Sequence, residues 1–117
     1  MAAPNIVNMS ILYGKTSLLA LTTSPLTAIT VNPSTLVKVQ SITVANTHAT
    51  LSVDVTVDIY RSSTAYRIAG AITIPAKSTL VVASRDGAVW LEENDALRLT
   101  ASANSCLESV ISYDVMT

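Results

Sequence analysis

The sequence is poor in several residue types, and each shortage excludes a class of protein. Its 117 residues include one cysteine, three glycines, four prolines and no phenylalanine, and only 13% of them are charged. A single cysteine cannot pair within the chain, so a disulfide-rich scaffold is excluded. Seven lysines and arginines against eight acidic residues leave no basic excess for non-specific binding of nucleic acid.

Long hydrophobic runs are also missing. The longest apolar stretch near the start, Ser17–Leu21, is halted by two threonines, a serine and Pro25. A membrane helix needs about 20 apolar residues, and a secretory signal needs an apolar core of about 7–15 residues behind a basic start. We therefore expect no signal peptide and no membrane partner for a chain made in the cytoplasm.

What the sequence does contain is a high share of hydrophobic residues, which make up 50% of the chain. This content excludes intrinsic disorder, and the length fits one domain. The charged fraction is about half of the ~25% that is typical of a soluble domain. Low charge on an apolar chain predicts that much of its surface is buried against other subunits.

Apolar residues recur with a period of two. Between Leu51 and Tyr60, five aliphatic residues alternate with Ser, Asp and Thr. Successive side chains of a strand point to opposite faces, so this pattern predicts a half-buried β-strand. Similar alternation occurs in residues 66–74, where Gly70 interrupts the apolar face, and in residues 97–102 and 107–114. A phase shift near Gln40–Ser41 predicts a β-bulge.

Turn residues separate these segments at a spacing of roughly 8–12 residues, which is typical of antiparallel sandwiches and barrels. Asp86-Gly87 predicts a hairpin with a type I′ turn between Leu80–Ser84 and Ala88–Leu91. The predicted fold is a single-domain antiparallel β-sandwich of about seven to eight strands, either immunoglobulin-like or jelly-roll-like. Residues 31–117 form the sandwich, and the less regular residues 1–30 form an N-terminal arm or edge strands.

No residue pattern indicates catalysis or a cofactor. Gly14-Lys15-Thr16 resembles the end of a phosphate-binding loop, but Met9 occupies the position where that loop needs its first glycine. His48 lies in a predicted turn, and Cys106 begins a predicted strand with no basic neighbour in sequence. We interpret both as structural residues, expect no cofactor, and predict that the chain is not an enzyme.

The acidic segment Glu92-Glu93-Asn94-Asp95 is a weak candidate for a metal site. Glu92, Glu93 and Asp95 offer carboxylate oxygens, which Ca²⁺ prefers, but the EF-hand spacing is absent. The favoured alternative is a polar corner between strands in which Asn94 and Asp95 bond to their own backbone.

Large aromatic and aliphatic side chains are the best candidates for contact with other molecules, because Trp and Tyr are enriched at protein interfaces. An aromatic side chain could instead stack on a sugar, which leaves a carbohydrate-binding module open through Trp90, Tyr60 or Tyr66. The candidate interface residues are Ile6, Tyr13, Leu18, Leu19, Tyr60, Tyr66 and Trp90.

Several segments together resemble a group of small virion proteins of tailed bacteriophages, especially myoviruses of cyanobacteria. The resemblance rests on Ile72–Val82 with its "PA-S-LVV" pattern, on the "LEE-D-L" corner within Val89–Leu97, and on the final "SY" of Val110–Tyr113. Residues 3–8 and 14–16 are also similar, so the resemblance covers most of the chain. This sequence has Asn94 where such proteins commonly have Gly or another small turn residue.

The resemblance implies a non-enzymatic virion component with a β-sandwich fold, assembled into particles after synthesis in the host cytoplasm. Within the virion, we expect a head decoration or cement protein that binds and stabilises the outer capsid. A neck, tail or baseplate protein is the nearest alternative. The expected partners are the major capsid protein or other virion proteins, and self-association, for which a trimer is one expected form.

Overall fold

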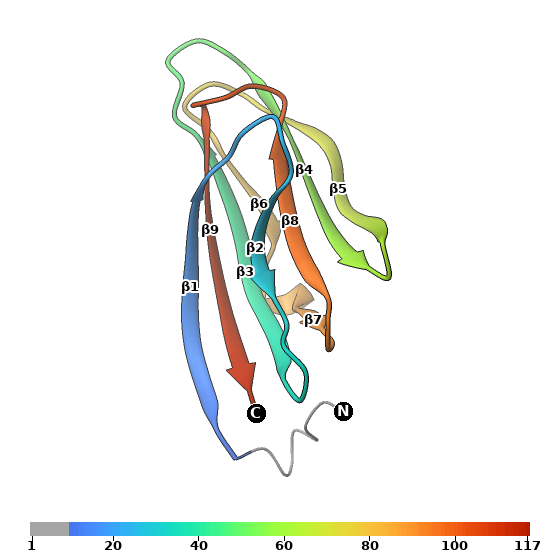
Figure 1. The fold of residues 1–117 in the computed structure, drawn as a ribbon. Helices are drawn as coiled ribbons and strands as arrows, with labels where there is room; N and C mark the ends of the chain where they lie inside the picture. The colour runs from blue at the N-terminus through green and yellow to red at the C-terminus, as the bar shows by residue number, and fades with distance from the viewer. Residues whose placement is uncertain (1–9) are drawn as a thin grey trace.

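The computed structural model describes residues 10–117, which form nine strands and one turn of 3-10 helix (Figure 1). The elements are β1 (Leu12–Ala20), β2 (Leu26–Thr30), β3 (Leu36–Asn46), β4 (Val53–Arg61), β5 (Thr64–Ile74), β6 (Thr79–Ala83), η1 (Arg85–Gly87), β7 (Val89–Leu91), β8 (Ala96–Ala101) and β9 (Leu107–Met116).

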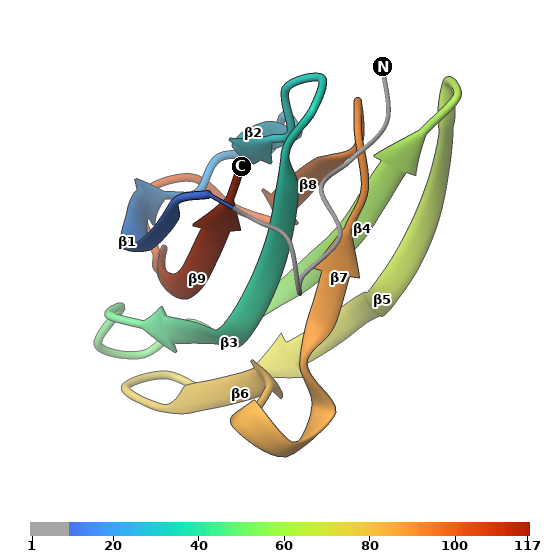
Figure 2. The ribbon, with the colours of Figure 1, turned by 90° about the horizontal axis from the view of Figure 1, so that it is seen from below.

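The strands form two antiparallel sheets that face each other (Figure 2). Sheet A has the order β1-β9-β3-β6, with β7 also paired to β3, and sheet B has the order β2-β8-β4-β5. If β6 and β7 are counted as one interrupted strand, this is the eight-stranded jelly-roll arrangement. The predicted antiparallel sandwich is therefore confirmed, and the topology is the jelly-roll form of the two that the sequence left open.

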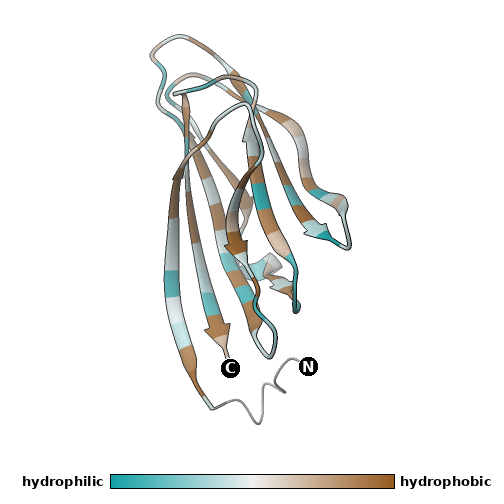
Figure 3. Ribbon diagram, in the orientation of Figure 1, coloured by the Kyte–Doolittle hydropathy of each residue, from teal (hydrophilic) through white to brown (hydrophobic). Residues whose placement is uncertain are grey.

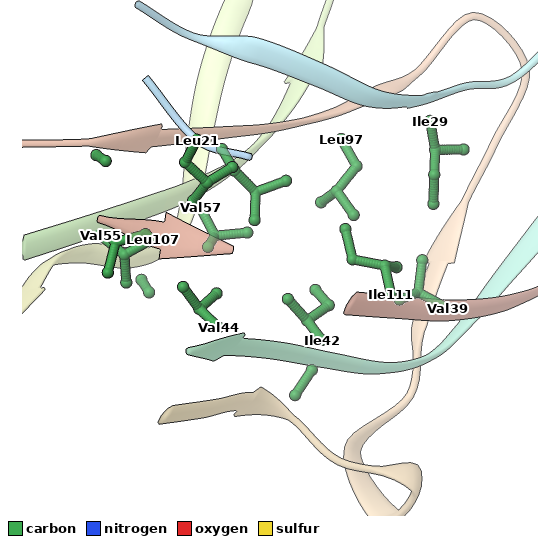
Figure 4. Close-up of a cluster of buried hydrophobic side chains, with 14 of the residues drawn as sticks. Leu21, Ile29, Val39, Ile42, Val44, Val55, Val57, Leu97, Leu107 and Ile111 are labelled. Carbon is green, nitrogen blue, oxygen red and sulfur yellow. The ribbon is translucent and has the colours of Figure 1, made fainter. Parts of the chain in front are cut away.

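The hydrophobic core lies between the two sheets, where side chains from both sheets point toward one another (Figure 4). Hydrophobic and less hydrophobic residues alternate along several strands (Figure 3). Val53, Val55 and Val57 of β4 are fully buried, as the alternation between Leu51 and Tyr60 predicted, while Leu51 itself precedes the strand and is exposed. Val39, Ile42 and their neighbours on β3 meet them from sheet A. Burial of aliphatic side chains, at about 1.5–3 kcal/mol each, is what holds the two sheets together.

The structure has a bulge at each of the two positions where the alternation in the sequence is interrupted, Gln40–Ser41 and Gly70. The register between β3 and β9 shifts between Val39 and Ser41, so the inward phase passes from Val39 to Ile42. In β5 the register with β4 shifts next to Gly70, between the pairs Val57–Ala69 and Val55–Ile72. The residue with positive φ in the second bulge is Ala71, at 53°, and its amide donates a hydrogen bond to the Thr56 hydroxyl.

The predicted hairpin at Asp86-Gly87 is wrong. These residues lie in η1, no glycine described has positive φ, and β6 and β7 do not pair with each other. Instead, β6 pairs with Ile42–Ala45 and β7 with Val37–Val39, both along β3. Pairing with the long strand β3 places β6 and β7 end to end, so the connection needs a short helical offset rather than a reversal.

The first part of the chain contributes one edge strand to each sheet. β1 lies at an edge of sheet A and β2 at an edge of sheet B, and the Ser17 hydroxyl links them by donating to the carbonyl of Ala28 at 3.4 Å. Residues 1–9, which include the interface candidate Ile6, lie outside the described residues.

The Asn46 side chain, at the end of β3, forms hydrogen bonds with other segments of the chain. Its side chain is buried, and its Nδ2 donates to the carbonyls of Leu51 and Ile74 at 2.8 and 2.9 Å. Its Oδ1 accepts from the amide of His48 at 3.0 Å. One amide group thus ties the end of β3 to the loop before β4 and to the end of β5.

Ser109 is a polar exception in the core. Its side chain faces inward on β9 and is buried, and in the described part of the chain its Oγ has no hydrogen-bond partner. A buried hydroxyl without a partner costs free energy, so Ser109→Ala should raise the free energy of unfolding by about 1 kcal/mol. Urea denaturation measures this, with Ser112→Ala on the opposite face as the control; a less stable Ser109→Ala variant would contradict it.

Candidate interaction surface

The acidic corner connects β7 of sheet A to β8 of sheet B, and an arginine at the end of β4 binds it. Arg61, at the end of β4, donates from Nε to Asp95 Oδ1 at 2.6 Å and from Nη2 to Asp95 Oδ2 at 2.5 Å. Arg61 Nη2 also lies 2.7 Å from Glu92 Oε2. The Glu93 carboxylate does not join this ion pair and instead accepts a hydrogen bond from the amide of Ser34.

Asp95 is the buried member of this corner, with its side chain 1% exposed. The hydrogen bonds from Arg61, followed by the bond from the Glu92 amide, hold the pKa of Asp95 below its usual value despite the opposing effect of burial. The same pairing raises the pKa of Arg61. A carboxylate with these donors is a structural ion-pair partner, with Asn94 beside it at a φ of 66°, a conformation that asparagine tolerates.

No group of three or more His, Cys, Asp or Glu side chains within the described residues is placed to hold a metal ion. The single thiol and the single imidazole are also engaged in local structure. Cys106 is buried and its Sγ contacts the carbonyl of Asn104, while His48 Nδ1 accepts from the amides of Thr50 and Leu51. Neither lies beside the acidic corner in the hydrogen-bond network.

The outer face of sheet A is where exposed hydrophobic side chains gather in register. Leu18 of β1 pairs with Val110 of β9, Val110 pairs with Thr43 of β3, and Thr43 pairs with Val81 of β6. Paired residues in antiparallel strands project to the same face, so these four side chains form one row across the sheet, the outer row. Leu18 is 70% exposed, Val81 59% and Val110 45%.

The outward positions next to the outer row are mostly uncharged. On one side of the outer row lie Thr16, Ser112 and Ser41. On the other side Glu108 borders the outer row, and Lys38 with Asp114 lies toward the opposite end of the strands. Three exposed aliphatic side chains aligned in one row, with few charges around them, form a surface suited to contact with another protein.

Two of the predicted interface residues lie on this outer face. Leu18 belongs to the outer row, and Trp90 of β7 pairs with Lys38 toward the end of the strands, with Lys38 Nζ 5.5 Å from the centre of the indole ring. Leu19, beside Leu18 in sequence, points inward and packs against the core. Tyr13, near the start of β1, is half exposed.

The remaining predicted aromatic residues lie on sheet B. The Tyr60 ring is covered by the Arg98 guanidinium, 4.0 Å from the ring centre, and Arg98 in turn pairs with the buried Asp58 at 3.0 Å. Tyr66 of β5 is exposed and lines a shallow hollow with Ile59 and Arg61. Trp90 therefore comes from a different sheet than Tyr60 and Tyr66, and the three do not form a shared stacking surface on one sheet.

The sequence-based prediction of interface residues did not include Val110, Thr43 and Val81. Val110 could have been predicted as an exposed apolar residue. Within residues 107–114, it is the one apolar residue on the face of the strand that also has Glu108, Ser112 and Asp114. Its alignment with Leu18 and Val81 could not have been predicted, since the three residues come from strands far apart in sequence.

Comparisons with known proteins concern the fold. No protein-family model matches the chain, and no curated protein matches its sequence. A chain from the structure of Bacillus endospore appendages, described as a novel family of disulfide-linked pili, is similar with a TM-score of 0.55 and 12% identity, over 92% of this chain and 87% of that chain. A chain from the acidic stable capsid of Helicobacter pylori bacteriophage KHP30 is similar with a TM-score of 0.55 and 8% identity, over 93% and 90%.

At such low identities these likenesses establish a shared fold. Neither of these two structures is of a cyanobacterial myovirus protein, so the resemblance to that group has no support from them and stays a prediction. None of the helices in residues 10–117 is long and apolar enough to cross a membrane.

Proposed function

We propose that this chain is a non-enzymatic structural subunit of a phage particle, and specifically a head decoration protein that binds the outer capsid and stabilises it. The observation that carries the proposal is the outer face of sheet A, where the exposed aliphatic residues Leu18, Val110 and Val81 lie in one row across the sheet, joined by Thr43. The fold that it shares with a chain of a phage capsid and the resemblance to small virion proteins support the same function.

Attachment through this face would work by removing apolar area from water. At about 25 cal/mol per Å², and after the cost of association, a single copy gains a modest free energy. Repetition over a symmetric lattice multiplies the contacts, and it strengthens retention of the whole layer through avidity. Because the outer row itself carries no charge, we expect attachment to depend only weakly on salt concentration.

The test is the number of copies retained on particles. Quantitative mass spectrometry of purified virions should find hundreds of copies of the wild-type protein relative to the portal. Val110→Glu places a charge in the outer row and should lower occupancy about tenfold or more, because a buried unpaired carboxylate is costly. Thr100→Glu, at a partly buried position on sheet B, is the matched control and should keep full occupancy.

Two outcomes would contradict the proposal. A few dozen copies or fewer would place the protein in the neck, tail or baseplate. Full occupancy of Val110→Glu, with folding of each variant confirmed by thermal melting, would show that the outer face of sheet A is not the attachment surface. The carbohydrate-binding alternative gains no supporting observation, because Trp90 and the two tyrosines belong to different sheets.

A further inference from the structure

The four edges of the two sheets differ in how well they are protected against pairing with another strand. Natural sheets protect their edges with short strands, bulges, prolines or charges, because a free edge exposes a row of unpaired backbone groups. β2 has five residues and a register shift between Thr27 and Ile29. β5 carries two register shifts, and β6 and β7 are short and separated by η1.

β1 is the unprotected edge. It pairs with β9 over nine consecutive residues without a register shift, and it contains no proline and one charge, Lys15. Within residues 10–117, no strand lies on its other side (Figure 1, blue). A long, regular and weakly charged edge is a template for a further strand.

The hydrogen-bond pattern shows which groups of β1 are available. The amides of Ile11 and Leu21 donate to the carbonyls of Thr117 and Leu107 on the β9 side. Antiparallel ladders alternate, so the odd-numbered residues between them pair with β9 as well. The even-numbered residues Thr16, Leu18 and Ala20 therefore direct their backbone N–H and C=O groups toward the open edge.

We infer that two copies of this chain pair antiparallel through β1, with Leu18 of each copy opposite Leu18 of the other on a two-fold axis. Thr16 then lies opposite Ala20 of the second copy, and the outward-directed backbone groups of Thr16, Leu18 and Ala20 find partners in both strands. A second copy is the fitting occupant, because the other three edges are protected and a β1-to-β1 contact closes after two subunits.

The side chains select this register. With Leu18 on the axis, the two outer rows join into one continuous row, four side chains from each copy, and the most exposed leucine of the face gains a partner. A register centred on Thr16 would pair more residues, but it would set Lys15 diagonally beside Lys15 of the second copy and leave Leu18 opposite Gly14. Like charges at that spacing destabilise a strand pair.

The test is the oligomeric state of the purified full-length protein by analytical ultracentrifugation. The wild type should show a concentration-dependent equilibrium between monomer and dimer. Leu18→Lys and Leu18→Glu should each raise the dimer dissociation constant at least about tenfold, because each sets identical charges opposite each other. An equimolar mixture of the two variants should restore the dimer. Val81→Lys, at the other end of the same row, is the matched control and should dimerise like the wild type.

A second variant tests the backbone directly. Thr16→Pro removes an N–H that faces the open edge, which an edge strand tolerates, and it should weaken the dimer while the monomer stays folded. A wild type that is monomeric throughout, a trimer, or a dimer that both Leu18 variants and Thr16→Pro leave intact would each overturn the inference. These measurements use no virion, so their outcome is independent of the particle-occupancy test of the proposed function.

Discussion

Asn46→Asp should lower the free energy of unfolding by about 3 kcal/mol, although the two side chains have nearly the same shape. In the wild type, Asn46 Nδ2 donates to the carbonyls of Leu51 and Ile74, and the side chain is buried. The substitution replaces that donor by an acceptor, so two carbonyls lose their partner and face a carboxylate oxygen instead. Each buried polar group left without a partner costs about 1–3 kcal/mol.

The same substitution elsewhere in the chain provides the control. Asn104 is exposed, and its Oδ1 accepts from the amide of Thr23 at 2.9 Å. An aspartate there keeps the accepting oxygen, so Asn104→Asp should change stability by less than about 0.5 kcal/mol. Urea denaturation of both variants at neutral pH makes the comparison. Equal effects would show that the donor function of Asn46 is unimportant.

Asp95→Asn should destabilise the protein by about 2 kcal/mol at neutral pH. The Asp95 carboxylate accepts from Arg61 Nε and Nη2 and from the Glu92 amide, and an amide group can satisfy only some of these donors. Most of the loss comes from these hydrogen bonds at a buried side chain, because the Arg61 side chain is 45% exposed and its charge is screened by solvent.

The effect of Asp95→Asn should depend on pH in a defined direction. The pKa of Asp95 is lower in the folded protein than in the unfolded chain, where it is about 3.9. The unfolded state therefore takes up a proton first on acidification. The stabilisation is fully present above the unfolded pKa and is lost as the pH falls through the folded pKa.

The difference in unfolding free energy between wild type and Asp95→Asn should thus shrink below about pH 4. Urea denaturation at several pH values tests this, with Asp54→Asn as the control. Within residues 10–117, the Asp54 side chain accepts one hydrogen bond, from the Thr73 hydroxyl, so its replacement should have a small effect. A difference that stays constant from pH 7 to pH 3 would contradict the ion-pair interpretation.

Sequence patterns predicted the structure correctly where they depend on the geometry of a single strand. The alternation before Tyr60 predicted β4, and the phase shift at Gln40–Ser41 predicted a bulge, because inward and outward positions are fixed by the pleat of a strand. The hairpin at Asp86-Gly87 failed for the converse reason. Two residues that favour a tight turn were overruled by the pairing of β6 and β7 with one long strand.

Contacts between segments far apart in the sequence could not be predicted from the sequence pattern. Arg61 and Asp95 are 34 residues apart, and no feature of either segment indicates that the β4 end reaches the corner before β8. The predicted interface residues show the same limit. Leu18 and Leu19 looked alike in sequence, yet one is exposed on the outer face of sheet A and the other packs against the core.

The composition of the sequence and its period-two alternation determined, by themselves, that this chain is an all-β domain. Composition and alternation suffice for that conclusion, because each strand shows which of its faces is apolar. Only the tertiary structure decided which outward apolar residues meet. Register across β1, β9, β3 and β6 aligns Leu18, Val110, Thr43 and Val81 into one row, and register is a property of paired strands rather than of any one of them.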